Sequence, residues 1–367
     1  ITEYHMDGLR IDAVHGIFDF SAQHILFDIR EAVHGQAKKL NRHIVVIAES
    51  DLNDARVIDS PRRGGYGLDA QWNDDFHHSL HTLLTGERNG YYQDFGGVHQ
   101  LVKALREGFV YSGEYSRYRR RRHGRSSKHL PPSKFIDFSQ NHDQVGNRLK
   151  GERLSALVSF EALKLAAGIV LLSPSIPLLF MGEEYGEEAP FQYFVNHSDQ
   201  ALIEAVRKGR REEFSAFQPE GETPDPQDEA TFFRSKINLD RRHQGKNKIL
   251  FEFYKMLIKL RKEVPWLTCM EKKRFDLKAF KKEKALLIEW EYGDDRVIGL
   301  FNFNDKPIKI EVAVEKGDWE KIFSSASEEW GGLGALVPES IHSMGSGGIF
   351  LLDTHAFALY RKEGEAA

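Results

Sequence analysis

The apolar residues follow two different spacings, and the spacing changes near residue 265. Before that point, short apolar runs alternate with longer stretches in which apolar residues recur every three to four positions. The pattern predicts an α/β fold, because strands that alternate with helices are typical of parallel βαβ units. The runs predict strands at 8–11, 44–48, 68–72, 135–138 and 176–180, and the stretches predict helices at 21–40, 98–107, 153–172 and 247–264.

The rest of the chain predicts a small antiparallel β domain. Pro265 and Trp266 end the helical pattern, and from Phe275 onward apolar and polar residues alternate at a period of two. We therefore expect two domains, 1–265 and 266–367, the second a β-sandwich. The strand-like runs of this part, separated by turn residues, cover 285–290, 296–302, 308–312, 348–352 and 355–360.

The composition gives no reason to expect a membrane or a nucleic acid as partner. The 367 residues are 41% hydrophobic and 29% charged, with a net charge of −4. The most apolar stretch, 162–181, contains Lys164 and two prolines, which predicts a helix end and a buried strand rather than a membrane span. The basic run 117–125 has no recognition module beside it and is interpreted as a solvated loop. The single cysteine, Cys269, excludes an internal disulfide, and we expect a cytoplasmic protein.

Three acidic residues, Asp12, Glu49 and Asp143, follow predicted strand ends. Ligands bind at the carboxyl ends of parallel strands, so the three converge on one pocket if the sheet closes into a barrel. Arg10 and Asp12 are two residues apart and therefore point to the same face of their strand. An isolated Arg-x-Asp pair is more often a structural salt bridge, but the two further carboxylates favour a catalytic site.

Carboxylates in this arrangement suit glycoside hydrolysis. A retaining glycosidase needs an ionised carboxylate as nucleophile and a second carboxyl as acid and then base, about 5–5.5 Å apart. Asp12, beside the Arg10 cation, suits the first role, and Glu49, at the end of an apolar strand, suits the second. Asp143 is expected to hold sugar hydroxyls and stabilise positive charge in the transition state, with His142 as a hydrogen-bond donor. This chemistry requires no metal or cofactor.

Three segments resemble signature segments of the α-amylase superfamily: DGLRIDAVH (7–15), IAESD (47–51) and QNHDQVGN (140–147). The resemblance implies the same roles for Asp12, Glu49 and Asp143. It also implies a (β/α)₈ TIM barrel of which only the C-terminal strands are present, beginning with the fourth. We therefore expect either a complementing N-terminal segment as a partner of this chain or low activity of the chain in isolation.

Three longer segments resemble one branch of that superfamily, at 67–81, 181–199 and 204–214. This branch cleaves the α-1,4 bond next to the terminal trehalose of malto-oligosyltrehalose and releases trehalose. Two alternatives stay open. One is another enzyme acting on α-glucans, an α-amylase-type hydrolase or a branching enzyme, and the other is a non-catalytic glycan-binding fragment.

Further residues near the strand ends are expected to bind the substrate through hydroxyl contacts or ring stacking. His77 and His81 have a spacing that suits metal ligation on a helix, but surface or structural histidines are the favoured interpretation. The expected substrate-binding residues are Arg10, His15, Trp72, Asn73, Asp74, Asp75, His142, Gln144, Asn147, Glu184 and Tyr185.

Overall fold

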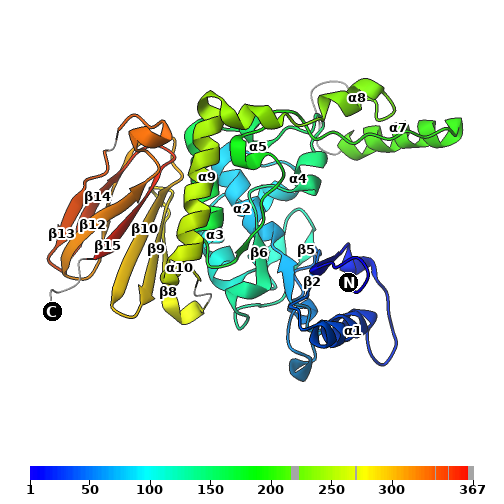
Figure 1. The fold of residues 1–367 in the computed structure, drawn as a ribbon, viewed down its shortest axis with the longest axis horizontal. Coiled ribbons are helices and arrows are strands. Elements are labelled where there is room, and N and C mark those ends of the chain that lie inside the picture. Colours follow the sequence, from blue (N-terminus) through cyan, green and yellow to red (C-terminus); the bar gives the residue numbers. More distant parts are fainter. Residues whose placement is uncertain (216–222, 269–270, 335, 346, 363–367) are drawn as a thin grey trace.

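The first part of the chain is built on one parallel sheet. In the computed structural model, which describes residues 1–215, 223–268, 271–334, 336–345 and 347–362, its strand order is β1-β2-β3-β6-β7 (Figure 1). Each strand lies beside the one before it in the chain, always on the same side, as in a (β/α)₈ barrel. In a doubly wound sheet, later strands are instead added on the other side of the first strand. The five strands are β1 (Gly8–Ile11), β2 (Val45–Ala48), β3 (Ala70–Trp72), β6 (Phe135–Asp137) and β7 (Ile176–Pro177).

Helices fill the crossovers between these strands. The predicted helix at 153–172 is two helices, because the Ser159 side chain accepts a hydrogen bond from the Ala162 amide and starts a new helix there. Figure 1 shows α7 projecting away from the sheets. The helices are α1 (Ile25–Leu40), α2 (Asp74–Thr85), α3 (Val98–Glu107), α4 (His142–Gly146), α5 (Leu154–Leu157), α6 (Phe160–Leu171), α7 (Gln200–Ser215), α8 (Glu229–Arg234), α9 (Gly245–Glu263) and α10 (Pro265–Thr268).

The second part contains two antiparallel sheets that face each other across an apolar core. The larger has the strand order β13-β12-β15-β10-β9-β8, and the smaller pairs β11 with β14. Alternate residues such as Leu287, Leu300 and Phe350 fill the space between them. The strands are β8 (Phe275–Phe280), β9 (Ala285–Tyr292), β10 (Asp295–Asn302), β11 (Ile308–Val312), β12 (Gly317–Ser324), β13 (Ser340–Ser343), β14 (Gly348–Leu352) and β15 (Phe357–Lys362). Strands β8, β12 and β13 were not among the predicted runs, and Cys269 lies outside the described residues.

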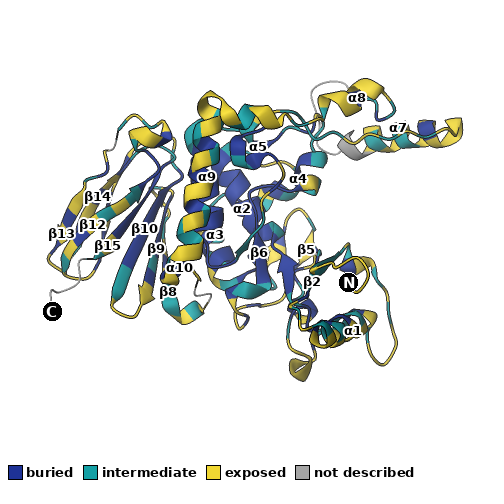
Figure 2. Ribbon diagram, in the orientation of Figure 1, coloured by how far each residue is buried: buried dark blue, intermediate teal, exposed yellow. Residues whose placement is uncertain are grey.

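One apolar core joins the two parts. Helices α6 and α9 contribute Leu165, Phe253 and Leu257 to the same buried cluster as Leu286 and Phe357 of the six-stranded sheet. Figure 2 shows α9 buried on one side and exposed on the other, between the two parts. A domain boundary at 265 stays a prediction. Among the described residues, no helix has both the length and the apolar character that a bilayer-spanning helix requires.

Candidate active site

The carboxyl ends of β1 and β2 and the start of α4 open into a polar cavity. Its volume is about 360 Å³. All three predicted catalytic carboxylates lie on its wall, as the strand-end argument requires. The lining residues are Asp12, Ala13, His15, Glu49, Asp51, Asp74, His78, Tyr91, Tyr118, Arg119, Asp143, Gln144 and Asn147.

The Arg10 guanidinium lies among the three carboxylates. Its Nη1 atom donates a 2.5 Å hydrogen bond to Oδ1 of Asp12. Its Nη2 atom lies 3.9 Å from Oε2 of Glu49 and 3.7 Å from Oδ2 of Asp143. The guanidinium carbon also lies 4.3 Å from the ring centroid of Trp72, a cation–π contact that fixes the plane of the fork. One cation therefore offsets the mutual repulsion of three carboxylates.

The end of β2 is tied to the loop after β1. The Ala13 amide donates a 2.6 Å hydrogen bond to Oε2 of Glu49. Ala13 has φ 41°, a left-handed conformation that is costly for a residue with a Cβ. Two backbone bonds fix the same loop: the Glu49 amide to the Ile11 carbonyl at 3.0 Å and the Val14 amide to the Glu49 carbonyl at 3.1 Å. The strained turn thus fixes Asp12 relative to Glu49.

Asp143 lies in the first turn of α4. Asn141 caps this short helix by accepting a 2.9 Å hydrogen bond from the Gln144 amide. The His142 ring lies edge-on to Trp72, and its Nε2 atom lies 3.3 Å from Oδ1 of Asp143. The Asp143 side chain is about half exposed, at 47%, so it faces the cavity while its backbone is held by the cap.

A second polar pair extends the cavity beside Glu49. Arg119 donates a 2.9 Å hydrogen bond from Nη1 to Oδ2 of Asp51, and Nε2 of His15 lies 3.9 Å from Oδ1 of Asp51. Arg119 belongs to the basic run that was interpreted as a solvated loop, which was wrong for this residue. It lies between β4 (Tyr115–Ser116) and β5 (Arg121–Arg122), whose pairing aims the turn at the cavity.

Several aromatic wall residues were also missed. Tyr91, Tyr118 and His78 lie on the cavity wall, with the His78 and Tyr91 rings 4.7 Å apart. None of these residues directly follows a strand predicted from the sequence, so the strand-end rule does not find them. For Asp51 a signal was present, since it follows Glu49 by two residues.

Asp74 is the one residue of the segment 73–75 that lines the cavity. The segment forms the start of α2, because Asn73 caps the helix by accepting a hydrogen bond from the Phe76 amide. Asp74 accepts a 3.3 Å hydrogen bond from Nε2 of Gln144. Burial, and next the charge of Glu49, raise the pKa of Asp74 well above its usual value.

The structure places other predicted residues away from the cavity wall. Asn73 is buried and donates a 2.9 Å hydrogen bond to Asp137. Asp75 accepts hydrogen bonds from the amides of Val110 and Tyr111, at 2.7 and 3.0 Å, and burial raises its pKa to about 6. We therefore leave Asn73 and Asp75 out of the substrate-binding set.

The predicted pair after β7, Glu184 and Tyr185, does not line the cavity either. The Tyr185 ring is fully buried, and its hydroxyl donates a 3.2 Å hydrogen bond to Glu187. In the described part of the chain, no group of three or more His, Cys, Asp or Glu side chains is arranged to hold a metal ion.

Comparisons with known proteins agree with this geometry. No family model matches the chain. It is 51% identical over 263 residues to a malto-oligosyltrehalose trehalohydrolase of Saccharolobus solfataricus, covering 72% of this chain and 44% of that protein. It is 42% identical over 320 residues to the Arthrobacter ramosus protein of the same name, covering 86% and 52%. The chain thus spans about half the length of these curated relatives.

A solved structure shares the fold over nearly the whole chain. It is the crystal structure of a Salmonella typhimurium protein provisionally described as an alpha amylase. The TM-score is 0.82 at 33% sequence identity, and the match covers 99% of this chain and 58% of that one. The parallel sheet is therefore part of an α-amylase-type barrel, followed by an antiparallel β domain, as the sequence predicted.

Proposed function

We propose that this chain, which belongs to the malto-oligosyltrehalose trehalohydrolase family of the α-amylase superfamily, carries the catalytic carboxylates of a retaining glycoside hydrolase. The enzyme cleaves the α-1,4-glucosidic bond next to the terminal trehalose of malto-oligosyltrehalose and releases trehalose. The observation that supports this most is the contact of one guanidinium, that of Arg10, with Asp12, Glu49 and Asp143 in one cavity.

Asp12 is the nucleophile in this proposal. Its side chain is 78% exposed, so a sugar ring in the cavity reaches it, and the bond from Arg10 orients its carboxylate. Asp12 attacks the anomeric carbon and forms a glycosyl-enzyme as the bond to the trehalose unit breaks. Asp143 then lies close to the ring on which positive charge develops, and its negative charge stabilises that transition state.

Glu49 is the acid and then the base. Because the Ala13 amide holds Oε2 of Glu49, we assign the transferred proton to Oε1. Glu49 protonates the leaving oxygen in the first step and takes a proton from water in the second, when water attacks the glycosyl-enzyme. Sugar hydroxyls meet the remaining polar groups of the wall, His15, Asp74, Gln144 and Asn147.

A complementing segment on the free side of β1 is part of the proposal. In the described sheet, β1 is an edge strand whose one neighbour is β2. Large apolar side chains before and after β1, among them Tyr4, Phe18 and Phe20, are more than three-quarters exposed. An unpaired strand beside exposed aromatics is a surface that further strands of a barrel cover. We place the protein in the cytoplasm, because it has a single cysteine.

Two substitutions test the function. Asp12→Asn and Glu49→Gln keep the side-chain shapes but remove the nucleophile and the acid, so each should lower kcat by more than about 1,000-fold. Asp7→Asn is the matched control, because Asp7 precedes the same strand but pairs with Arg42 outside the cavity. Free trehalose as product supports the proposal, whereas shorter maltodextrins or new branch points favour another α-glucan enzyme. Binding of the sugar without turnover in the unsubstituted protein, measured with the complementing segment present, favours the glycan-binding alternative.

A further inference from the structure

Helix α4 is too short to be stable alone, yet it carries part of the active site. It covers His142–Gly146, and Asp143, Gln144 and the following Asn147 all lie on the cavity wall. Forming a single helical turn costs more conformational entropy than its hydrogen bonds return, so a five-residue helix needs anchors elsewhere in the fold. The position of Asp143 therefore depends on what holds the two ends of α4.

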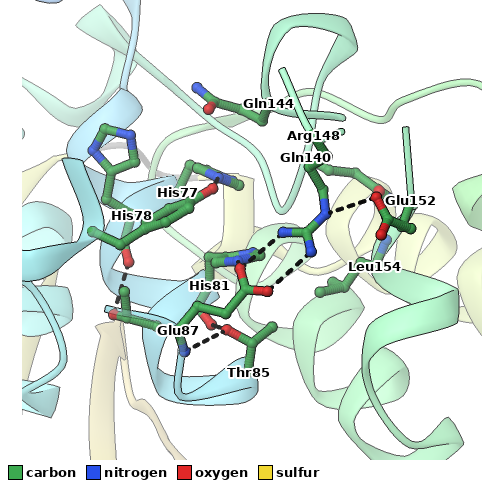
Figure 3. Close-up of polar contacts among 12 residues, drawn as sticks. His77, His78, His81, Thr85, Glu87, Gln140, Gln144, Arg148, Glu152 and Leu154 are labelled. Atoms are coloured by element: carbon green, nitrogen blue, oxygen red, sulfur yellow. Dashed lines mark hydrogen bonds and ion pairs between the residues drawn. The ribbon is translucent and has the colours of Figure 1, made fainter. Parts of the chain in front are cut away.

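The C-terminal end of α4 is held by an ion pair with the loop after α2. Arg148 donates two parallel hydrogen bonds to Glu87, from Nη1 to Oε2 at 2.8 Å and from Nη2 to Oε1 at 2.9 Å (Figure 3). Two parallel hydrogen bonds fix the plane of the guanidinium relative to the plane of the carboxylate, whereas a single bond between point charges does not. The Glu87 amide in turn bonds to Oγ1 of Thr85, the last residue of α2, at 3.2 Å.

A layer of buried rings keeps Glu87 in place and charged. His81 lies 2.8 Å from Oε2 of Glu87 through Nε2, and its ring stacks on Tyr92 at 4.4 Å. The hydrogen bond from His81 lowers the pKa of Glu87 to about 2, against the effect of burial, and Arg148 adds to it. Burial lowers the pKa of His81, so a neutral His81 donates to an ionised Glu87.

Helix α2 thus holds α4 at two points. Its first residue, Asp74, accepts the bond from Gln144 at 3.3 Å, and the loop after its last turn supplies Glu87 to Arg148. Two further contacts lie at the C-terminal end of α4. Glu152 lies 3.5 Å from Nε of Arg148 without a hydrogen bond, and Arg210 donates to the Gly146 carbonyl at 3.1 Å.

We propose that Glu87 and Arg148 are positioning residues for Asp143, acting through α4, and that His81 holds Glu87 for this task. The inference rests on the proposed function, which gives Asp143 its part in the reaction. Without the pair, the last turn of α4 frays and Asp143 no longer stays near the reacting sugar. A displacement of about 1 Å at a catalytic group is enough to cost on the order of 100-fold in rate.

The test is Glu87→Gln, which keeps the shape of the side chain but removes its charge, and Arg148→Lys, which keeps a charge but loses the fork. Glu152→Gln is the matched control, because Glu152 forms only an ion pair with Nε of Arg148, at 3.5 Å and without a hydrogen bond, so the variant removes a charge beside Arg148 and leaves the fork to Glu87 intact. Two measurements are made with the whole chain: kcat and KM on malto-oligosyltrehalose, and hydrogen exchange at the Asn147 amide, which bonds to the Asp143 carbonyl at 2.8 Å.

We expect both test variants to lower kcat by at least about tenfold and to speed exchange at Asn147, with a rise in KM because Gln144 and Asn147 move with Asp143. Glu152→Gln should change none of these. An unchanged kcat with unchanged exchange in both test variants would overturn the proposal, as would an equal loss in the control. If Glu87→Gln does not fold, the kcat of Arg148→Lys and its exchange at Asn147 test the proposal instead. If the unsubstituted chain releases no trehalose even when it is supplied with the complementing segment, the proposed function fails, and exchange at Asn147 alone then decides whether the pair holds α4.

Discussion

Nη2 of Arg10 lies 3.7 Å from Oδ2 of Asp143, although the two residues come from the first strand and from α4. Arg10 spans this distance because its side chain lies flat over Trp72 and is mostly buried. Carboxylates that share a cavity repel one another, and the repulsion grows as water is excluded. A fixed cation between them offsets this repulsion, so that three carboxylates can share one site. Arg10 is thus part of the catalytic geometry as well as a partner of Asp12.

Arg10→Lys tests this conclusion. Lysine keeps the charge but has a single point donor, so it cannot bond to Asp12 while also approaching Glu49 and Asp143. We expect kcat/KM on malto-oligosyltrehalose to fall by about 100-fold or more, as measured by trehalose release. The control is Arg42→Lys, since Arg42 pairs with Asp7 at 2.6 Å away from the cavity wall. Equal kcat/KM values for the two variants would contradict the prediction.

Asp94 holds the hairpin that carries Tyr118 and Arg119. Its carboxylate accepts hydrogen bonds from the Tyr111 hydroxyl at 2.7 Å, from the Ser116 hydroxyl at 2.8 Å and from the Tyr118 amide at 3.2 Å. Asp94→Asn replaces one acceptor oxygen by an NH₂ group and leaves some of these donors unpaired, at a cost of about 1–3 kcal/mol. We expect KM for malto-oligosyltrehalose to rise several-fold, with a smaller change in kcat.

The control for Asp94 is a carboxylate at the start of the same hairpin. Glu114 pairs with Lys103 at 2.6 Å, and neither residue lines the active-site cavity. Glu114→Gln should leave KM unchanged, because its partner takes no part in the cavity. A KM for Asp94→Asn that equals the control value would show that the hairpin is held by other contacts.

The sequence was sufficient for the parts of the site that depend on strand geometry. The first strand was predicted at the residues it occupies, since its alternation and the following polar loop are local signals. Asp12, Glu49 and Asp143 were predicted to converge because parallel strands end at the same face, and the structure places all three in one cavity. The prediction needed no knowledge of distances between residues far apart in the chain.

The remaining features depend on contacts between distant segments. Arg119 was assigned to a solvated loop because nothing near it in sequence indicates that it pairs with Asp51. Asn73 and Asp75 follow a strand, as site residues do, but Asn73 caps α2 and Asp75 accepts hydrogen bonds from the amides of Val110 and Tyr111. The backbone strain at Ala13 is equally invisible in composition, since alanine has no special preference for positive φ.

Glu183 makes the stability of the fold depend on pH. It is buried, with the hydroxyls of Ser139 and Tyr254 at 3.3 and 3.4 Å, and burial raises its pKa to about 8 from a usual value of 4.5. The folded state therefore holds this proton more tightly than the unfolded state does. This contribution to the free energy of unfolding is complete below about pH 4.5 and is lost as pH rises through about 8.

Glu183→Gln mimics the protonated carboxyl and should remove this dependence. Between pH 5 and pH 8, the free energy of urea unfolding of the unsubstituted protein should fall relative to the variant by up to about 1.4 kcal/mol per pH unit. Glu184→Gln is the control, because the adjacent side chain is only partly buried. A constant difference between the unsubstituted protein and Glu183→Gln across this range would show that Glu183 is ionised throughout.

The packing of α6 against the β domain gives a prediction about stability that does not depend on the proposed function. Gly168 lies in α6 against the Phe357 ring, and a Cβ built at this glycine would overlap that ring. Phe357 cannot move aside, because it stacks between Phe301 and Phe323 at centroid distances of 5.2 and 5.5 Å. Gly168→Ala should therefore lower the free energy of unfolding by about 1–3 kcal/mol. Helix propensity alone predicts the opposite sign, a gain of about 1 kcal/mol.

The matched control for Gly168 is a glycine in a helix with open space around it. Gly35 lies inside α1, is exposed, and has no atom within 4 Å of a Cβ built on it. Gly35→Ala should therefore raise the free energy of unfolding by about 0.5–1 kcal/mol, through propensity alone. Thermal unfolding followed by circular dichroism measures both variants under the same conditions. If both raise the unfolding midpoint, then α6 does not pack directly against Phe357, and the shared core of the two parts is looser than the contact indicates.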